Sequence, residues 1–503
     1  MELLNNLAIG FSTALSLTNL LYCFFGVLLG TLIGVLPGLG AVATIAMLLP
    51  ATFSLPPVSS LIMLAGIYYG AQYGGSTTAI LVNLPGESSS VVTALDGYKM
   101  ACQGRAGAAL TTSAVGSFVA GSIATLLIAM FATPLSAFAL AFGPPEYFSL
   151  MVLGLVASVV LAHGSLLKAI CMIILGLLLG LVGTDVNSGL SRFTFEQPQI
   201  AEGISFVAVA MGLFGIGEIV RNLEHESGGA RTAGIPRVGS LMPTRDEIRR
   251  IIAPIFRGTA LGSILGILPG GGAMLASFAS YSLEKKLSPH PETFGNGAIE
   301  GVAGPESANN AGAQTSFIPM LTLGIPSNAV MALMAGAMIM QGIQPGPSVM
   351  VEQPALFWGM VTSMWIGNIM LVILNLPLIG IWVRLLAVPY HLLFPVIIVI
   401  CGIGAFSVSN SVFDIHLMAA FGVLGYVFFK LECEPAPLLL GFILGPMMEE
   451  YLRRAMLLSR GDFTVFLTRP ISATLLALSA AALALVVLPA FRKTREEAFH
   501  EED

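Results

Sequence analysis

Two stretches of the chain share one pattern: they read GVLLGTLIGVLPGLGA from Gly26 to Ala41 and GTALGSILGILPGGGA from Gly258 to Ala273. One constant offset aligns most of their glycines and places Pro37 opposite Pro269. Proline interrupts a helix because it has no N–H donor, and glycine weakens one because it adds conformational freedom. The sequence therefore predicts a broken helix at equivalent places in two halves of the chain.

A second pair of motifs follows in the same order. AILVNLPGESS runs from Ala79 to Ser89 and precedes QGRAG at Gln103, while PMLTLGIPSNA runs from Pro319 to Ala329 and precedes QGIQPG at Gln341. A repeated unit of broken helices is typical of secondary transporters, which bind substrate where such helices meet.

The predicted organisation has four parts. A first membrane half covers residues 1–220 with repeat motifs in 26–110, and a second covers 258–490 with repeat motifs in 258–347. An Arg-rich cytoplasmic loop at 221–257 separates the halves, and a cytoplasmic tail covers 491–503.

Composition indicates a membrane protein. Of the 503 residues 55% are hydrophobic and only 10% are charged, whereas soluble domains carry about 25% charged residues. From Leu3 to Gly86 the chain contains no Asp, Glu, Lys or Arg. We expect an all-α polytopic protein of about 10–14 membrane segments, including re-entrant hairpins.

The basic residues predict an orientation. Seven Arg lie between Arg221 and Arg257, which makes this segment cytoplasmic under the positive-inside rule. The cluster of Arg453, Arg454 and Arg460 carries the same signature, as does the C-terminal tail. The N-terminal segment has no basic residue and is expected outside. The two repeats would then be inverted relative to one another.

Other functional classes lack sequence support. The net charge of −6 leaves no basic surface for nucleic acid. The five Cys form no CxxC pair, the six His are dispersed, and no Walker A motif is present. We therefore expect no metal site, no cofactor, no enzymatic activity and no ATP hydrolysis by this chain.

Backbone breaks at membrane depth imply a site. Unpaired N–H and C=O groups are tolerated there only inside protein or beside a watery cavity. A helix that starts after a break favours an anion such as a carboxylate, and one that ends before it favours a cation. The predicted hinges are Gly38, Gly40, Pro85, Gly86, Gly270, Gly272, Pro305 and Pro326.

Neutral polar side chains beside the breaks are the candidate substrate ligands, since they replace hydration without a fixed charge. They are Ser76, Thr77, Thr78, Asn83, Ser88, Ser89, Asn309, Asn310, Gln314, Ser327 and Asn328. Taken singly, each is also explained by helix capping or contact between helices.

Glu87 and Glu306 each follow a proline-containing motif beside these clusters, in PGESS and GPESANN. Ionisable groups at membrane depth are costly, so we expect them to couple transport to an ion, together with Asn83 and Gly324 at the helix ends. The alternative is that both are first-turn carboxylates stabilised by a helix dipole. Asp96 is expected to be a loop residue near Lys99 and Arg105.

With these motifs in place, the sequence resembles the large membrane subunit of the tripartite tricarboxylate transporter family, the TctA-type permease. The similarity extends from about Gly26 to about Gly461. It is carried by GVLPGLGA, YYGAQYGGSTTAILVNLPGESSSVVTALDGY, GILPGGGA, GPESANNAGAQTSFIPMLTLGIPSNAV, QGIQPGP, LNLPLIGIWVRLL and PAPLLLGFILGP.

The resemblance implies a multi-pass protein of the bacterial inner membrane that imports carboxylates on an ion gradient. It also implies two partners, a small TctB-type membrane subunit and a periplasmic TctC-type solute-binding protein. Two places depart from the family pattern: Gln314, where the family often has a small residue, and the acidic segment Glu432 to Glu434. Because Gln314 lies within the candidate site, the resemblance does not assign citrate to this chain as its substrate.

The sequence thus predicts import of a di- or tricarboxylate, bound between paired breaks near the bilayer midplane and coupled to Na⁺ or H⁺, with Na⁺ favoured. One block would move against a scaffold of lipid-embedded spans such as 356–386. The alternatives are a carboxylate channel or uniporter without ion coupling, an intramembrane enzyme and a scaffold protein. The particular carboxylate, the stoichiometry and the oligomeric state stay open.

Overall fold

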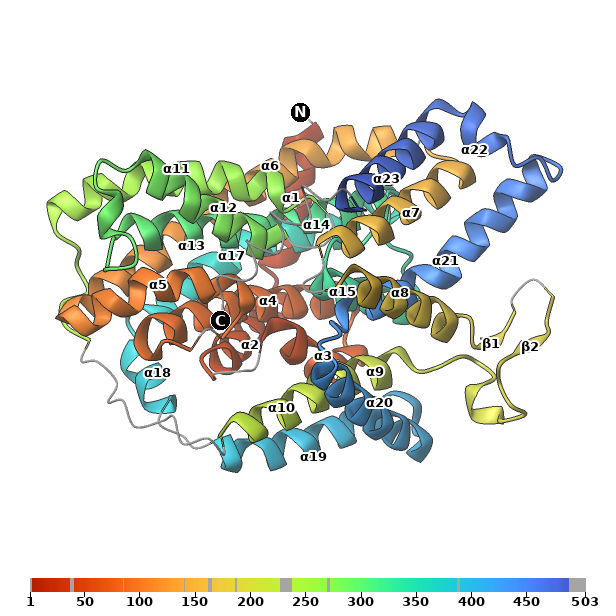
Figure 1. Ribbon diagram of the computed structural model, residues 1–503, viewed down its shortest axis with the longest axis horizontal. Coiled ribbons are helices and arrows are strands. Elements are labelled where there is room, and N and C mark those ends of the chain that lie inside the picture. Colours follow the sequence, from red (N-terminus) through yellow and green to blue (C-terminus); the bar gives the residue numbers. More distant parts are fainter. Residues whose placement is uncertain are drawn as a thin grey trace.

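The fold is helical, as expected. The computed structural model describes residues 2–36, 40–84, 86–139, 141–161, 165–185, 188–226, 238–268, 272–386 and 390–487. Within these ranges the regular structure consists of helices and one two-stranded hairpin (Figure 1). The prediction of an all-α protein is confirmed.

The described residues of the first half form ten α-helices and the hairpin. The helices are α1 (Glu2–Ala14), α2 (Leu17–Gly34), α3 (Ala41–Phe53), α4 (Pro57–Val82), α5 (Val91–Met100), α6 (Ala106–Ala139), α7 (Pro144–Leu161), α8 (Leu166–Gly180), α9 (Phe206–Ala210) and α10 (Gly217–Glu226). The antiparallel strands are β1 (Gly183–Thr184) and β2 (Ser191–Arg192). Short 3₁₀ or π segments are η1 (Ser88–Ser90), η2 (Ala101–Arg105), η3 (Pro198–Ile200) and η4 (Met211–Ile216).

In the second half the regular structure of the described residues is helical. Its helices are α11 (Arg245–Leu265), α12 (Gly272–Leu287), α13 (Glu300–Thr315), α14 (Phe317–Leu323), α15 (Ala329–Met340), α16 (Ser348–Glu352), α17 (Pro354–Asn375), α18 (Ile379–Leu385), α19 (Tyr390–Ser409), α20 (Val412–Lys430), α21 (Ala436–Leu458), α22 (Val465–Thr468) and α23 (Pro470–Val487). A 3₁₀ turn, η5 (Pro291–Thr293), precedes α13.

Several helices are suited to a bilayer. Among the described residues, five helical segments are long and apolar enough to cross one: Leu17–Gly34, Ser88–Leu135, Phe206–Glu224, Pro354–Asn375 and Val412–Lys430. Six shorter apolar helices accompany them. The protein is a multi-pass membrane protein, and the number of 10–14 segments stays a prediction.

Glycine allows the same close packing in both halves. A Cβ at Gly30 of α2 would lie 2.3 Å from the carbonyl oxygen of Ile67 on α4. A Cβ at Gly262 of α11 would lie 2.2 Å from the carbonyl oxygen of Ala308 on α13. Real Cβ atoms do not approach so closely, so the backbones meet because these positions lack side chains. The packing agrees with the sequence offset, while duplication and its inversion stay predictions.

The predicted helix interruptions are present. In the first half, α2 ends at Gly34 and α3 begins at Ala41. In the second, α11 ends at Leu265 and α12 begins at Gly272. Residues 37–39 and 269–271, which include the predicted hinges Gly38 and Gly270, lie outside the described residues.

The second pair of breaks follows α4 and α14. Asn83 ends α4 in the left-handed conformation with φ 57°, and Gly324 ends α14 with φ 75°. A left-handed residue stops a helix because it turns the chain away from the axis. Helix α15 then starts at Ala329, where the Asn328 side chain accepts a hydrogen bond from the Met331 N–H at 2.9 Å.

Three sequence expectations need correction. Pro305 lies inside α13 and is not a hinge, because the helix continues from Glu300 to Thr315 and loses one backbone hydrogen bond at the proline. The expected span 356–386 is interrupted between α17 and α18. The Arg-rich segment is helical at both ends, because α10 extends to Glu226 and α11 starts at Arg245.

The two ends of the molecule differ. Figure 1 shows α5 and α11 at one end and the β1–β2 hairpin at the other. At the first end Arg105 pairs with Glu247 of α11. At the hairpin end Arg453 pairs with Asp185 at 3.1 Å. The start of α11 and the Arg453 pair therefore lie at opposite ends, and the side of the membrane on which each basic cluster lies stays a prediction.

Candidate functional site

A buried carboxylate of the second half is held by hydroxyls of the first. Glu306 on α13 is 0% exposed. Its Oε2 accepts hydrogen bonds from Ser76 of α4 at 2.7 Å and from Ser113 of α6 at 2.9 Å. Its Oε1 accepts a third from Thr93 of α5. Contacts between residues some 200 positions apart thus bind the two halves together.

The shell around Glu306 is neutral. Among the described residues, its side-chain partners are hydroxyls, with no Lys or Arg. A buried carboxylate without a basic partner is suited to binding a proton or a small cation, because either neutralises a charge that burial makes costly.

Asparagines on α13 extend this polar region. Asn310 donates to the Ser117 hydroxyl at 2.6 Å and to the Glu306 carbonyl at 3.1 Å. Asn309 is 0% exposed, and neither its amide nitrogen nor its amide oxygen has a hydrogen-bond partner. Buried amides are nearly always paired, so Asn309 is a strong candidate for contact with a ligand.

Glu87 has a different role. Its Oε1 accepts a hydrogen bond from the backbone N–H of Ala41 at 2.5 Å, and its Oε2 accepts one from Gln72 at 3.3 Å. Ala41 is the first residue of α3, so a carboxylate of the chain itself occupies this helix N-terminus. The Ser89 hydroxyl donates to the Gln72 amide oxygen at 3.1 Å and extends the cluster.

Tyr68 connects the two breaks, although the sequence analysis did not single it out. It is 2% exposed, and its hydroxyl lies within interaction range of Gln72 in the first half and of Ser316 and Asn328 in the second. Its position one helical turn before Gln72, on the same face of α4, was the available signal. The Ser327 hydroxyl donates to the Ser316 carbonyl at 3.2 Å and closes the second break.

The break segments also pack across the halves. The η1 segment after the first break lies against α12 and α13 of the second half. Helix α15 after the second break lies against α3 and α4 of the first half. Each half therefore places its break against the other half.

Some predicted ligands have local partners. Thr77 donates to the Tyr73 carbonyl at 3.1 Å, and Thr78 donates to the Val35 carbonyl at 2.7 Å, where it secures the end of α2. Gln314 is buried on α13 and accepts a hydrogen bond from Thr125 at 3.3 Å. These contacts are the capping and interhelical roles that the sequence left as the alternative.

Two predicted ligands lie outside the buried cluster. Asn83 and Ser88 are both exposed. Asn83 contributes to the break through its left-handed backbone conformation, which ends α4. The structure therefore brings together Ser76, Glu87, Ser89, Glu306 and Asn310 with their partners, but not these two.

The described hinges occupy tight positions. A Cβ at Gly86 would lie 2.4 Å from the Gly34 carbonyl oxygen, and one at Gly272 would lie 3.0 Å from the Gly266 Cα. Gly40 is the N-cap of α3, and Pro326 lies in the break after Gly324. The predicted hinge Pro85 lies outside the described residues.

Asp96 is not a loop residue, which corrects the sequence expectation. It lies in α5 and is 0% exposed. Its Oδ1 accepts backbone N–H bonds from Gly295, Gly297 and Ala298 at 2.9, 2.7 and 2.8 Å, and Tyr281 donates to Oδ2 at 3.0 Å. It thereby fastens the loop before α13 onto the first half.

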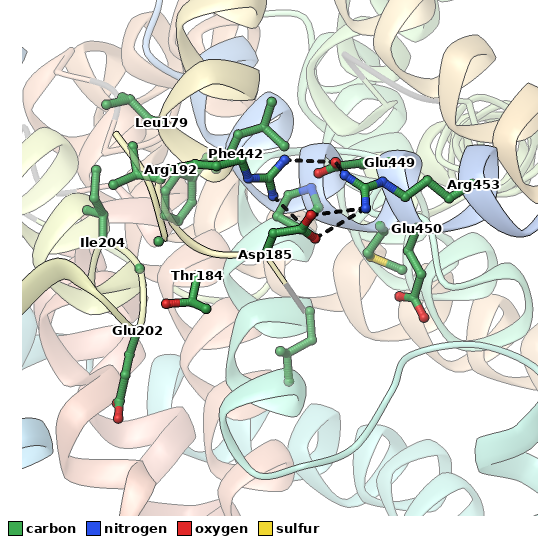
Figure 2. A pocket seen from close by; sticks show the side chains of 18 of the residues that line it. Leu179, Thr184, Asp185, Arg192, Glu202, Ile204, Phe442, Glu449, Glu450 and Arg453 are labelled. Carbon is green, nitrogen blue, oxygen red and sulfur yellow. Dashed lines mark hydrogen bonds and ion pairs between the residues drawn. The ribbon is translucent and has the colours of Figure 1, made fainter. Parts of the chain in front are cut away.

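A cavity of about 800 Å³ lies at the hairpin end, away from the Glu306 cluster. Figure 2 shows Asp185 and Arg192 of the hairpin region facing Glu449 and Arg453 of α21. Arg192 pairs with Glu449 at 2.8 Å, and Arg453 pairs with Glu449 at 2.6 Å and with Asp185 at 3.1 Å. The far wall includes Ile339 and Gly342 at the end of α15.

Comparison with known proteins identifies the family. A protein of Agrobacterium vitis described as an uncharacterized 52.8 kDa protein in the TAR-I ttuC' 3' region is 62% identical over 503 residues, the whole of both chains. Another from the same organism, described as an uncharacterized protein in the TAR-II ttuC' 3' region, is 62% identical over 242 residues, 48% of this chain and the whole of that one. No solved structure matches the chain. The pattern that defines the tripartite tricarboxylate transporter TctA family matches residues 20–440, and the chain therefore belongs to that family.

Proposed function

We propose that the protein is the permease subunit of an ion-gradient-driven importer in the bacterial inner membrane. It takes up a di- or tricarboxylate that a periplasmic TctC-type solute-binding protein delivers, and it works with a small TctB-type membrane subunit. The chain belongs to a family of transporters, and this supports transport over an enzymatic role.

One observation supports the site above all others: each break packs against the opposite half, and both present neutral polar groups, with the Glu87 carboxylate beside those of the first break. Tyr68, Gln72 and Ser89 come from one side, and Ser316, Ser327 and Asn328 come from the other. A substrate between them would sense a movement of one half against the other, which is what alternating access requires.

The neutral lining has a consequence for the mechanism. Without a fixed cation, binding a dianion at membrane depth would be costly. A coupling ion bound first at Glu306 would offset that cost. We therefore propose an ordered scheme in which Na⁺ or H⁺ binds first and the carboxylate second.

The hairpin-end cavity is the proposed entrance. It lies at the end opposite the Arg-rich segment, which the positive-inside rule makes cytoplasmic. It also borders the end of α15, the helix whose first turn is capped by Asn328 in the proposed site. A binding protein docked there would sit at the end of a helix that leads to the site.

Uptake into proteoliposomes tests the proposal. Labelled di- and tricarboxylates are offered to vesicles that hold this chain and its small partner, with liganded binding protein and an inward Na⁺ or H⁺ gradient each present or absent. We expect accumulation only when both are present. Simple equilibration without gradient dependence would favour the channel or uniporter, and no flux with any carboxylate would contradict the substrate class.

A further inference from the structure

A second, much smaller cavity lies beside Glu306. It has a volume of about 10 Å³ and is bounded by Tyr73 and Thr77 of α4, by Ser113 of α6, and by Asn375 and Ile379 around the link between α17 and α18. Ser113 is the residue that donates to Glu306 Oε2 at 2.9 Å. The cavity is therefore one hydroxyl away from the buried carboxylate.

Two polar atoms that border this cavity have no partner. Tyr73 and Asn375 are each 4% exposed, and neither the Tyr73 hydroxyl nor the Asn375 amide oxygen has a hydrogen-bond partner among the residues that the structure describes. The Asn375 amide nitrogen is already used, since it donates to the Leu371 carbonyl at 2.9 Å. Leaving such groups unsatisfied is unfavourable, and a volume of this size is about that needed for one water molecule.

The cavity faces the Arg-rich end of the molecule. Ile379 packs against the apolar cluster that includes Ile251 of α11 and borders Val238. Leu376, which also bounds the cavity, is only partly buried. The other two donors to Glu306, Ser76 and Thr93, are 1% and 0% exposed and face the interior.

We propose that this cavity binds one ordered water, which forms a proton relay between the Arg-rich end and Glu306. The water would donate to the Asn375 amide oxygen and contact the Tyr73 and Ser113 hydroxyls. Ser113 passes its hydroxyl proton to Glu306 Oε2 and takes one from the water, which regains one from a hydronium ion of the solvent near Leu376. The net result is that the solvent loses one proton and the Glu306 carboxylate gains it, while Ser113 and the ordered water are unchanged.

In the part of the chain that the structure describes, the charged groups around Glu306 do not lie between it and the cavity, so the cavity is the direct path for a proton. Tyr73 is a titratable neighbour on α4. Glu87, at the start of the η1 segment that packs against α13, is engaged by the Ala41 N–H and by Gln72. Asp96 on α5 is engaged by three backbone amides, and Glu284 on α12 is paired with Arg257. Among the described residues, none of these charged groups borders the cavity.

The relay deepens the proposed function, because it names the proton as an ion that Glu306 takes up. Its role in transport therefore rests on the proposed ion coupling. Its test reads proton exchange and not transport. The whole chain is studied as a reconstituted film by infrared spectroscopy at mildly acidic pH. The carboxyl stretch of Glu306 is assigned by its loss in Glu306→Gln, and exchange is followed after a change to D₂O.

Asn375→Leu removes the acceptor and fills the cavity, and Tyr73→Phe removes the hydroxyl. We expect exchange at Glu306 to slow roughly tenfold or more in Asn375→Leu, because one member of the relay is lost. Asn375→Ser keeps an oxygen and should exchange nearly as fast as the unchanged protein. Asn368→Leu is the matched control, since Asn368 is a buried α17 asparagine with an unpartnered amide nitrogen outside this cavity.

Two results would overturn the relay: exchange in Asn375→Leu as fast as in the unchanged protein, or no Glu306 carboxyl band in mild acid. Thermal unfolding of each variant shows that a slower exchange is not caused by misfolding. If exchange slows in Asn375→Leu but uptake by the unchanged protein needs no ion gradient, the relay stands and the proposed coupling fails.

Discussion

At the scale of single residues, two glutamates that look alike in sequence have different surroundings. Glu87 binds the N-terminus of α3 and a glutamine of its own half. Glu306 reaches across to hydroxyls of the other half. Only Glu306 combines full burial with a neutral shell between the halves, and it is the better candidate for ion coupling.

Replacement of the two glutamates should separate their roles. We expect Glu306→Gln to abolish the dependence of uptake on the ion gradient, because the residue that binds the ion is neutral at every pH. Glu87→Gln keeps an oxygen that can accept from Ala41 and should reduce uptake less. Initial uptake rates with and without the gradient measure both effects. Equal loss of gradient dependence in the two variants would contradict this assignment.

Asp96 should contribute strongly to stability. Asp96→Ala leaves three backbone N–H groups without an acceptor and is expected to cost about 2–4 kcal/mol. Asp96→Asn keeps an acceptor and should cost less. Asp414→Ala is the control, because Asp414 is 8% exposed and its carboxylate accepts a hydrogen bond from the Ser409 side chain and not from a set of backbone amides. Thermal unfolding in detergent gives the comparison, and similar losses for Asp96→Ala and Asp414→Ala would refute it.

At the scale of elements, small residues let helices touch through their backbones. Helices α2 and α4 in one half, and α11 and α13 in the other, approach so closely that a single added carbon has no room. These four helices carry or flank the breaks. Their tight packing therefore sets where the break residues lie.

Alanine substitutions should reveal this packing. We expect Gly30→Ala and Gly262→Ala each to destabilise the protein by about 1–3 kcal/mol, because the added carbon forces the backbones apart. Gly402→Ala is the control: Gly402 lies in α19 and an added Cβ would meet nothing within 4 Å. Unfolding temperatures should fall for the first two and hold or rise for the third. A fall of equal size for Gly402→Ala would contradict the packing argument.

At the scale of the whole molecule, orientation follows from which charged groups share an end. Arg105 and the start of α11 lie together, whereas Arg192 and Arg453 lie with the hairpin. The Arg-rich segment is the larger basic cluster, so we propose from the positive-inside rule that its end is cytoplasmic. In this orientation the hairpin cavity would open toward the periplasm.

Thiol labelling tests this orientation. Cys102 is exposed near the Arg-rich end, and Gln199 is exposed beside the hairpin. We expect a membrane-impermeant maleimide to label Gln199→Cys in intact cells but to label Cys102 only after permeabilisation. Comparison of the unchanged protein with Cys102→Ser separates the Cys102 signal from that of the other native thiols, which include the exposed Cys171. Labelling of Cys102 in intact cells would reverse the proposed orientation.

The sequence by itself determined the helical membrane fold, the positions of most breaks and the polar character of the residues beside them. These properties are local: glycine, proline and apolar runs act on the backbone around them. Contacts between distant residues needed the tertiary structure. It decided that Pro305 stays within a helix, that Asp96 is buried, that Tyr68 joins the two breaks and that Glu306 binds Ser76 and Ser113. Such contacts depend on how helices some 200 residues apart pack, and no local pattern encodes that distance.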